Sequence, residues 1–165
     1  MVRGMHLAEL NVGRLVAPTD DPRIAYFQNN LDRVDAIGDR SDGFIWRMSS
    51  DEMEAEQVNG EGPLKDRPNT ASTLSVWTGP KPLYDFAVKT VHAKFMARSH
   101  EWFEPDDCGH LVLWWVPENH RPAVAEGLAT WTTLQQTGPT DMMFGAAELK
   151  ALSEGYTLLR TDDGS

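Results

Sequence analysis

The sequence predicts an α+β fold built on one antiparallel sheet, of the ferredoxin-like βαββαβ kind with an extra C-terminal helix. Four segments have the period or composition of strands, and long amphipathic stretches follow the first and third of them. A further amphipathic stretch follows the fourth strand. Strands and helices in this order are typical of the split βαβ arrangement.

The first strand and the first helix are expected over residues 7–15 and 22–38. Leu10 and Val12 share one face of the strand, because successive side chains alternate between its faces. Pro22 suits the first turn of the helix, where its missing N–H has no intrahelical partner, and an aspartate before it can cap. One buried helix face is predicted by apolar residues at helical spacing: Ile24, Phe27, Leu31, Val34 and Ile37.

The second and third strands are expected over residues 43–50 and 70–78, joined by a long mobile loop at 51–68. The loop segment begins acidic, is rich in Gly and Pro, and contains almost no large apolar residue. Two roles for this loop stay open: a lid that excludes water from a site, and a solvated connector.

A second long helix is expected over residues 81–103, started by Pro80 and Pro82. Its buried stripe should consist of four residues at helical spacing: Tyr84, Val88, Val91 and Phe95. The fourth strand, 109–116, has an unbroken apolar run, which is typical of a strand buried on both faces.

A third helix is expected near residues 121–136, opened by Pro122. Residues 1–145 are interpreted as a single domain. Residues 146–165 are interpreted as a C-terminal extension that contains a short helix and a partly disordered polar tail.

The predicted strands carry apolar and aromatic residues on both faces, as Trp114 and Trp115 illustrate. A ferredoxin-like sheet has its helices on one face only, so the other face needs a cover. In a single-domain chain the simplest cover is a second copy, related by a two-fold axis. The sequence therefore predicts a homodimer, and with it a dimeric α+β barrel.

Composition excludes several classes of function. The net charge of −10 argues against binding to nucleic acid or to an anionic membrane surface, since both need clustered Lys and Arg. Cys108 is the single cysteine, so an internal disulfide and a cysteine-based zinc site are excluded. No apolar run marks a signal peptide or a membrane span, and a cytoplasmic location is expected.

No established catalytic motif is present, and His92 is the best single candidate for chemistry. It borders the buried stripe of the second helix, so it is either a satisfied structural histidine or a pocket acid/base or haem ligand. His100 stands eight residues further on, about 12 Å along a helix, which is too far for both to bind one metal ion. No metal is predicted.

Asn11 and Arg47 interrupt otherwise apolar strands. Each either lies at an edge facing solvent, or hydrogen-bonds a ligand and stabilises an oxyanion in a cavity. The aromatic residues nearby are either core or the wall of a small-ligand pocket. The expected lining of such a pocket is aromatic: Trp46, Trp77, Trp102, Trp114 and Phe95.

Several short motifs give the chain a family resemblance: GFIWR, SVW, VHAKFM, EWF, LWWVP and GPT. From about residue 6 to about 144 the sequence resembles an uncharacterised bacterial domain family grouped with the antibiotic-biosynthesis monooxygenase-like dimeric α+β barrels. The resemblance implies a dimer and a small-molecule site. Chemistry in that superfamily ranges over phenol oxidation, polyketide cyclisation, lactone isomerisation and haem reactions, and no catalytic residue transfers to this chain.

The function expected from these observations is a small-molecule enzyme acting on an aromatic or polyketide-like compound. It would be a cofactor-independent monooxygenase or a related cyclase or isomerase, with His92 as acid/base and Arg47 or Asn11 as oxyanion partner. Two alternatives stay open: a haem-binding enzyme with His92 as axial ligand, and a non-catalytic module that only binds a small ligand.

Overall fold

The computed structural model describes residues 3–58, 69–90, 93–94, 97–104 and 110–155. Within them, five antiparallel strands form an open sheet in the order β2-β3-β1-β4-β5. The strands are β1 (Met5–Arg14), β2 (Phe44–Arg47), β3 (Thr70–Trp77), β4 (His110–Pro117) and β5 (Met143–Phe144). The α+β class and the four predicted strands are confirmed, while β5 was not predicted.

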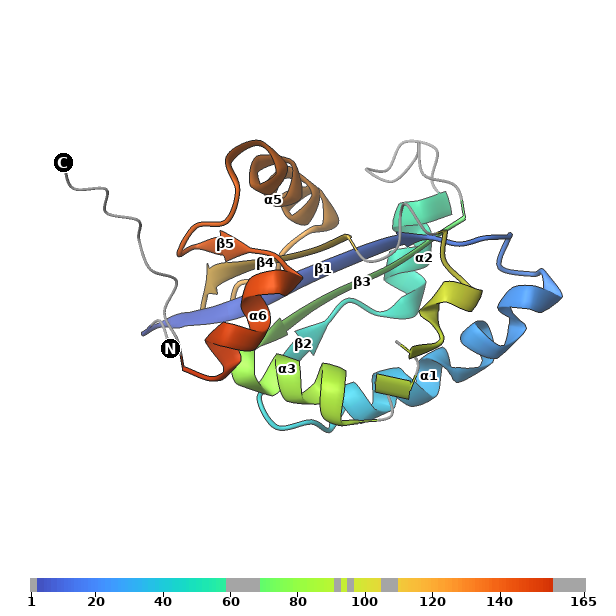
Figure 1. Ribbon diagram of the computed structural model, residues 1–165, viewed down its shortest axis with the longest axis horizontal. Helices are drawn as coiled ribbons and strands as arrows, with labels where there is room; N and C mark the ends of the chain where they lie inside the picture. Colours follow the sequence, from blue (N-terminus) through green and yellow to red (C-terminus); the bar gives the residue numbers. More distant parts are fainter. Residues whose placement is uncertain (1–2, 59–68, 91–92, 95–96, 105–109, 156–165) are drawn as a thin grey trace.

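Helices cover the sheet on both sides (Figure 1). They are α1 (Ala25–Asp39), preceded by the 3-10 turn η1 (Pro22–Ile24), then α2 (Ser50–Val58), α3 (Pro80–Lys89), α5 (Val124–Thr137) and α6 (Ala146–Ser153), with a second 3-10 turn η2 (Ser99–Glu101). As predicted, an aspartate opens the first helical stretch: Asp21 accepts a hydrogen bond from the backbone N–H of Arg23 at 2.9 Å.

The two faces of the sheet have separate cores. Ala8, Leu10 and Val12 of β1 point to one face, where Met53 of α2 and Val124 of α5 cover them. We call this the α5 face. Leu7 of β1 points to the opposite face, which we call the α3 face; α3 and α6 cover one end of it, and α1 packs toward the other end.

The covering of the α5 face removes the argument by which the sequence predicted a dimer. That argument placed all helices on one face and left the other for a second copy. Instead α5 lies so close to β1 that a Cβ on Gly127 would meet Leu10 Cδ2 at 2.7 Å. The apolar residues of this face are therefore buried within one chain, by α5 and α2.

Two predicted boundaries and one predicted buried position were wrong. The helix expected over 81–103 is interrupted after Lys89, where the backbone of Thr90 is extended. Val88, expected in the buried stripe, is 43% exposed, and Leu83 is buried instead. The loop expected over 51–68 begins as helix α2; residues 59–68 lie outside the described part of the chain.

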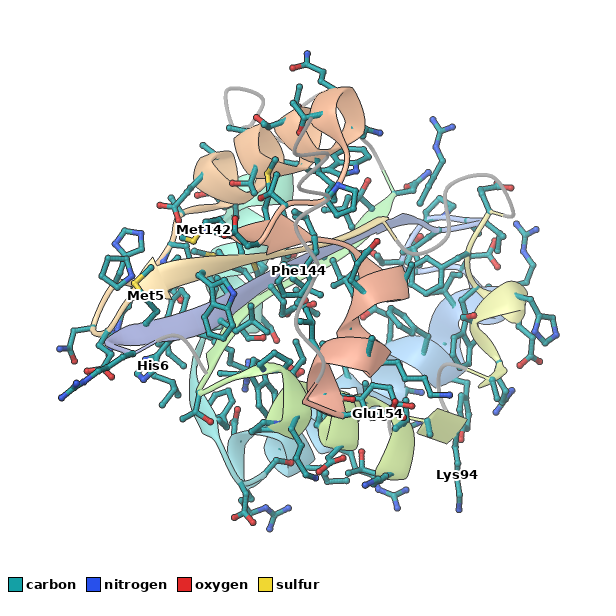
Figure 2. All side chains as sticks on the ribbon, turned by 60° about the vertical axis from the view of Figure 1, so that its left-hand side comes forward. Met5, His6, Lys94, Met142, Phe144 and Glu154 are labelled. Atoms are coloured by element: carbon teal, nitrogen blue, oxygen red, sulfur yellow. The ribbon has the colours of Figure 1, made fainter. Side chains whose placement is uncertain are left out.

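The short helix expected after residue 145 is α6. Its Leu149 is buried in the cluster that includes Leu7, Trp77 and Leu113, and Figure 2 shows the neighbouring Phe144 pointing into the middle of the molecule. The folded unit therefore extends through Ser153.

Candidate functional site

Glu9 is a carboxylic acid in the interior of the sheet. It stands in the middle of β1, points to the α3 face and is only 6% exposed. Its register partner on β3 is Ser75, whose hydroxyl donates to Glu9 Oε1 at 2.7 Å. Thr73, two residues earlier on the same strand, donates to Oε1 at 3.1 Å. Two hydroxyls on one strand thus hold the acid on the next.

Burial changes the acidity of this group. Loss of solvent raises the pKa of Glu9 from 4.5 to about 7, against the opposing effect of the hydrogen bonds from Ser75 and Thr73. A carboxyl group with a pKa near neutrality exchanges a proton readily in either direction at physiological pH. This is the property required of a general acid or base.

A third residue orients the hydroxyl of Ser75. The indole Nε1 of Trp77 donates to Ser75 Oγ at 2.9 Å. Because an indole N–H can only donate, it occupies a lone pair of the serine oxygen and leaves the hydroxyl proton free to point at Glu9. The hydrogen-bonded series Trp77–Ser75–Glu9 therefore restrains the carboxyl group from the β3 side.

The carboxyl group borders an uncovered part of the α3 face. Asn11 and Thr73, which are register partners on β1 and β3, are both exposed. At the next register pair on the same face, two residues along each strand, Glu9 and Ser75 are buried. We call these four residues the polar strip. A molecule that contacts Asn11 and Thr73 would lie next to Glu9.

Aromatic side chains stand at each end of the polar strip. At one end Trp77 stacks on Phe86, with ring centroids 5.3 Å apart, and meets Phe44 edge to face at 5.5 Å. At the other end the ring of Phe103 lies so close over Gly13 that a Cβ there would stand 2.6 Å from it. Phe103 in turn packs edge to face on Phe27.

Arg47 does not have the role expected of it. It lies in the same row of the sheet as Ser75 and Glu9, yet its guanidinium pairs with two acids of α1: Asp39, with Nε to Oδ1 at 2.7 Å, and Asp35, with Nη1 to Oδ2 at 3.4 Å. Burial raises the pKa of Asp35, and the nearby guanidinium opposes that shift. The charge of Arg47 is thus used to attach β2 to α1.

The structure separates the aromatic residues expected to line one pocket. Trp77 and Trp102 belong to clusters of the α3 face. Trp46 and Trp114 pack on the α5 face, so they cannot line the same site as Glu9. His92 and Phe95 lie outside the described residues. Of the expected acid/base and oxyanion residues, the structure places Asn11 beside the buried acid.

Glu9 itself was not predicted. The signal available in the sequence was a glutamate within an otherwise apolar strand, together with a strand that alternates Thr73, Ser75 and Trp77 on one face. What joins them is the register between segments more than sixty residues apart. No local pattern determines that register.

A second polar cluster lies at the α5 face. Glu126 of α5 accepts from Trp114 Nε1 at 3.0 Å and contacts His120 Nε2 at 2.7 Å. His120 and Glu126 are both substantially exposed, so this cluster attaches the first turn of α5 to β4 in contact with solvent. In the described part of the chain, no three His, Cys, Asp or Glu side chains are arranged to hold a metal ion.

Fold and site together define an α+β protein with a titratable acid buried at the centre of an open antiparallel sheet. The chain belongs to the family described as Domain of unknown function (DUF3291), whose model matches residues 6–156. No curated protein and no solved structure matches it. None of the helices in the described ranges combines the length and apolar character needed to cross a bilayer.

Proposed function

We propose that this protein is a small-molecule enzyme that transfers a proton within an aromatic or polyketide-like compound, with Glu9 as the acid/base. The observation that carries the proposal is the position of Glu9: it is buried, with a pKa raised to about 7, yet the next register pair on the same face, Asn11 and Thr73, is exposed.

The chemistry follows from the groups of the polar strip. Glu9 takes a proton from a carbon next to a carbonyl, and the electron pair of the broken C–H bond moves to the carbonyl oxygen. The amide N–H of Asn11 donates to that oxygen as its negative charge develops. Return of the proton to another carbon completes an isomerisation. Attack of the enolate carbon on a second carbonyl, whose oxygen takes the proton, completes a cyclisation.

A monooxygenase reaction begins with the same step. A phenol or an activated methylene gives its proton to Glu9, and dioxygen is the required co-substrate: one oxygen atom enters the product and the other leaves as water. We favour isomerisation or cyclisation, because these reactions need only the groups of the polar strip.

The ferredoxin-like topology and a homodimer are part of the proposal. Support for the topology comes from the strand order β2-β3-β1-β4 with α1 after β1 and α3 after β3. Since α5 covers one sheet face, a second copy would meet α5 or the edge strand β2, where Ile45 is exposed. Light scattering that gives a clean 18.5 kDa monomer at micromolar concentration would refute the dimer.

The test is solvent isotope exchange. Purified protein is incubated in D₂O with a panel of cyclic enones, β-diketones and phenols, and deuterium on carbon is measured by NMR while mass spectrometry detects rearranged or oxidised products. Wild-type protein should accelerate exchange into at least one compound, and Glu9→Gln should abolish it. Glu154→Gln, an exposed change at the far end of α6, is the matched control (Figure 2).

Two alternatives are outcomes of the same experiments. Binding of panel compounds without exchange or product in the wild type would favour a non-catalytic binding module. Haem binding is the second alternative: a Soret band on titration with haemin that His92→Ala removes would favour a haem protein, in which Glu9→Gln should have little effect on ligation.

A further inference from the structure

Arg47 and the cations of α3 and of the turn after it are paired with acids away from the polar strip. Arg47 is the nearest in the sheet, one strand beyond Ser75, and it is held by Asp39 and Asp35. Lys94 extends outward from the molecule (Figure 2) and is exposed. The remaining cations of α3 and the following turn pair on the surface with acids of their own segments: Lys81 and Lys89 with Asp85, and Arg98 with Glu101.

The ionised form of Glu9 therefore sets the sign of the charge that a ligand meets. Next to the strip, Arg47 is paired with Asp35 and Asp39, and Glu9 adds a third acidic group. A carboxylate or phosphate placed on Asn11 and Thr73 would lie beside Glu9, while the guanidinium of Arg47 is already paired with two acids. Because Glu9 is itself buried, its charge is screened less than that of a surface carboxylate, and it repels a neighbouring anion more strongly than it would in water.

The remaining features of the strip favour a flat, uncharged ligand that donates a hydrogen bond. Glu9 accepts hydrogen bonds, and the amide of Asn11 both donates and accepts. From Glu9 to Gly13, which Phe103 covers, β1 rises about 13 Å, a length comparable with that of one or two fused rings. Aromatic rings stand at both ends, with Trp77 and Phe86 stacked at one and Phe103 at the other.

We propose that the polar strip selects by charge: it binds neutral hydroxyaromatic or enolisable ring compounds and rejects the carboxylate of the same ring. This specificity rests on the proposed function, since it names the substrate class of the same site. Glu9 is then both the acid/base and the group that excludes anions. Arg47 is paired with Asp39 and Asp35, so it does not offer an unpaired positive charge that would attract an anion.

The experiment compares 2-naphthol with 2-naphthoate, which share a ring system and differ in charge. Dissociation constants are measured by calorimetry at about pH 8, where Glu9 is ionised. Naphthol should bind at least about tenfold more tightly than naphthoate. Glu9→Gln should bring the ratio close to one by improving naphthoate binding, because glutamine keeps the hydrogen bonds of Ser75 and Thr73 while removing the charge. Glu154→Gln removes one charge far from the strip and should leave the ratio unchanged.

Equal affinities in the wild type, tighter binding of naphthoate, or no naphthol binding below about 1 mM would overturn the inference. A ratio that Glu9→Gln and Glu154→Gln change equally would overturn it too, since net charge alone would then explain the effect. Failure of the proposed function looks different. Charge selection without isotope exchange would refute the proposed catalysis and support the proposed specificity. Isotope exchange without charge selection would support the catalysis and refute the specificity.

Discussion

Replacement of Glu9 by glutamine should stabilise the protein at alkaline pH while abolishing its proton transfer. In the folded protein the pKa of Glu9 is about 7, against an ordinary value of 4.5. The folded state therefore holds a proton that the unfolded state has already released between these two values. The contribution of Glu9 to stability is full below pH 4.5 and is lost as the pH rises to 7.

The magnitude follows from the same two values. At about 1.4 kcal/mol for each pH unit between 4.5 and about 7, ionisation of Glu9 costs the folded state about 3 kcal/mol at alkaline pH. Glutamine has nearly the same shape and its carbonyl accepts from Ser75, but it cannot ionise. Glu9→Gln should raise the free energy of unfolding by about 2–3 kcal/mol at about pH 8 and change it little at about pH 5.

The assay is urea unfolding followed by tryptophan fluorescence and circular dichroism at both pH values, at one protein concentration. Comparison with wild type at each pH cancels the effects of other groups, such as Asp35, whose pKa is also raised by burial. Glu154→Gln should show no difference between the two pH values. If Glu9→Gln is no more stable than wild type at the higher pH, Glu9 is not an acid whose burial opposes its ionisation.

Three further predictions test the surroundings of the acid. Ser75→Ala removes a hydrogen bond that lowers the pKa of Glu9, so the pH profile of isotope exchange should move to higher pH. Ser75→Thr keeps a hydroxyl and should restore the wild-type profile. An unchanged profile in Ser75→Ala would contradict the orienting role of Ser75. Gly127→Val should lower the free energy of unfolding by about 2 kcal/mol, because the valine side chain would overlap Leu10. The control Thr133→Val, at an exposed position of α5, should change the free energy of unfolding little. Equal urea midpoints for the two variants would refute the close packing of α5. Arg47→Met should cost up to about 1 kcal/mol and raise the pKa of Asp35 further, measurable by NMR titration; an unchanged pKa would show that the ion pair with Asp35 is absent in solution.

Local chemistry was sufficient for much of the fold. The alternation around Leu10 and Val12 predicted β1, and Pro22 behind an aspartate predicted the start of the first helical stretch. Such signals depend on the period of a strand or on the unpaired N–H groups of a helix end, and both are properties of a few consecutive residues. The strand–helix order likewise predicted the α+β class.

Where competing local preferences met, the prediction failed. Proline and apolar spacing favoured one helix through residue 103, but the backbone is extended at Thr90 and interrupts the helix there. The acidic segment after β2 looked like a loop, but Met53 packs on the α5 face and supports helix α2. Its single apolar anchor was too weak a signal to distinguish helix from loop.

By itself, the sequence determined the strands, most helix starts and the class of the fold, because those depend on neighbours in the chain. Only the tertiary structure decided which surface covers each sheet face and which polar residues meet. Burial of the α5 face depends on where α5 packs on the sheet after β4, with Gly127 against Leu10. The raised pKa of Glu9 depends on the register of β1 and β3, which places Ser75 beside it and water away from it. Desolvation is a property of the whole packed molecule, so no pattern along the chain could predict it.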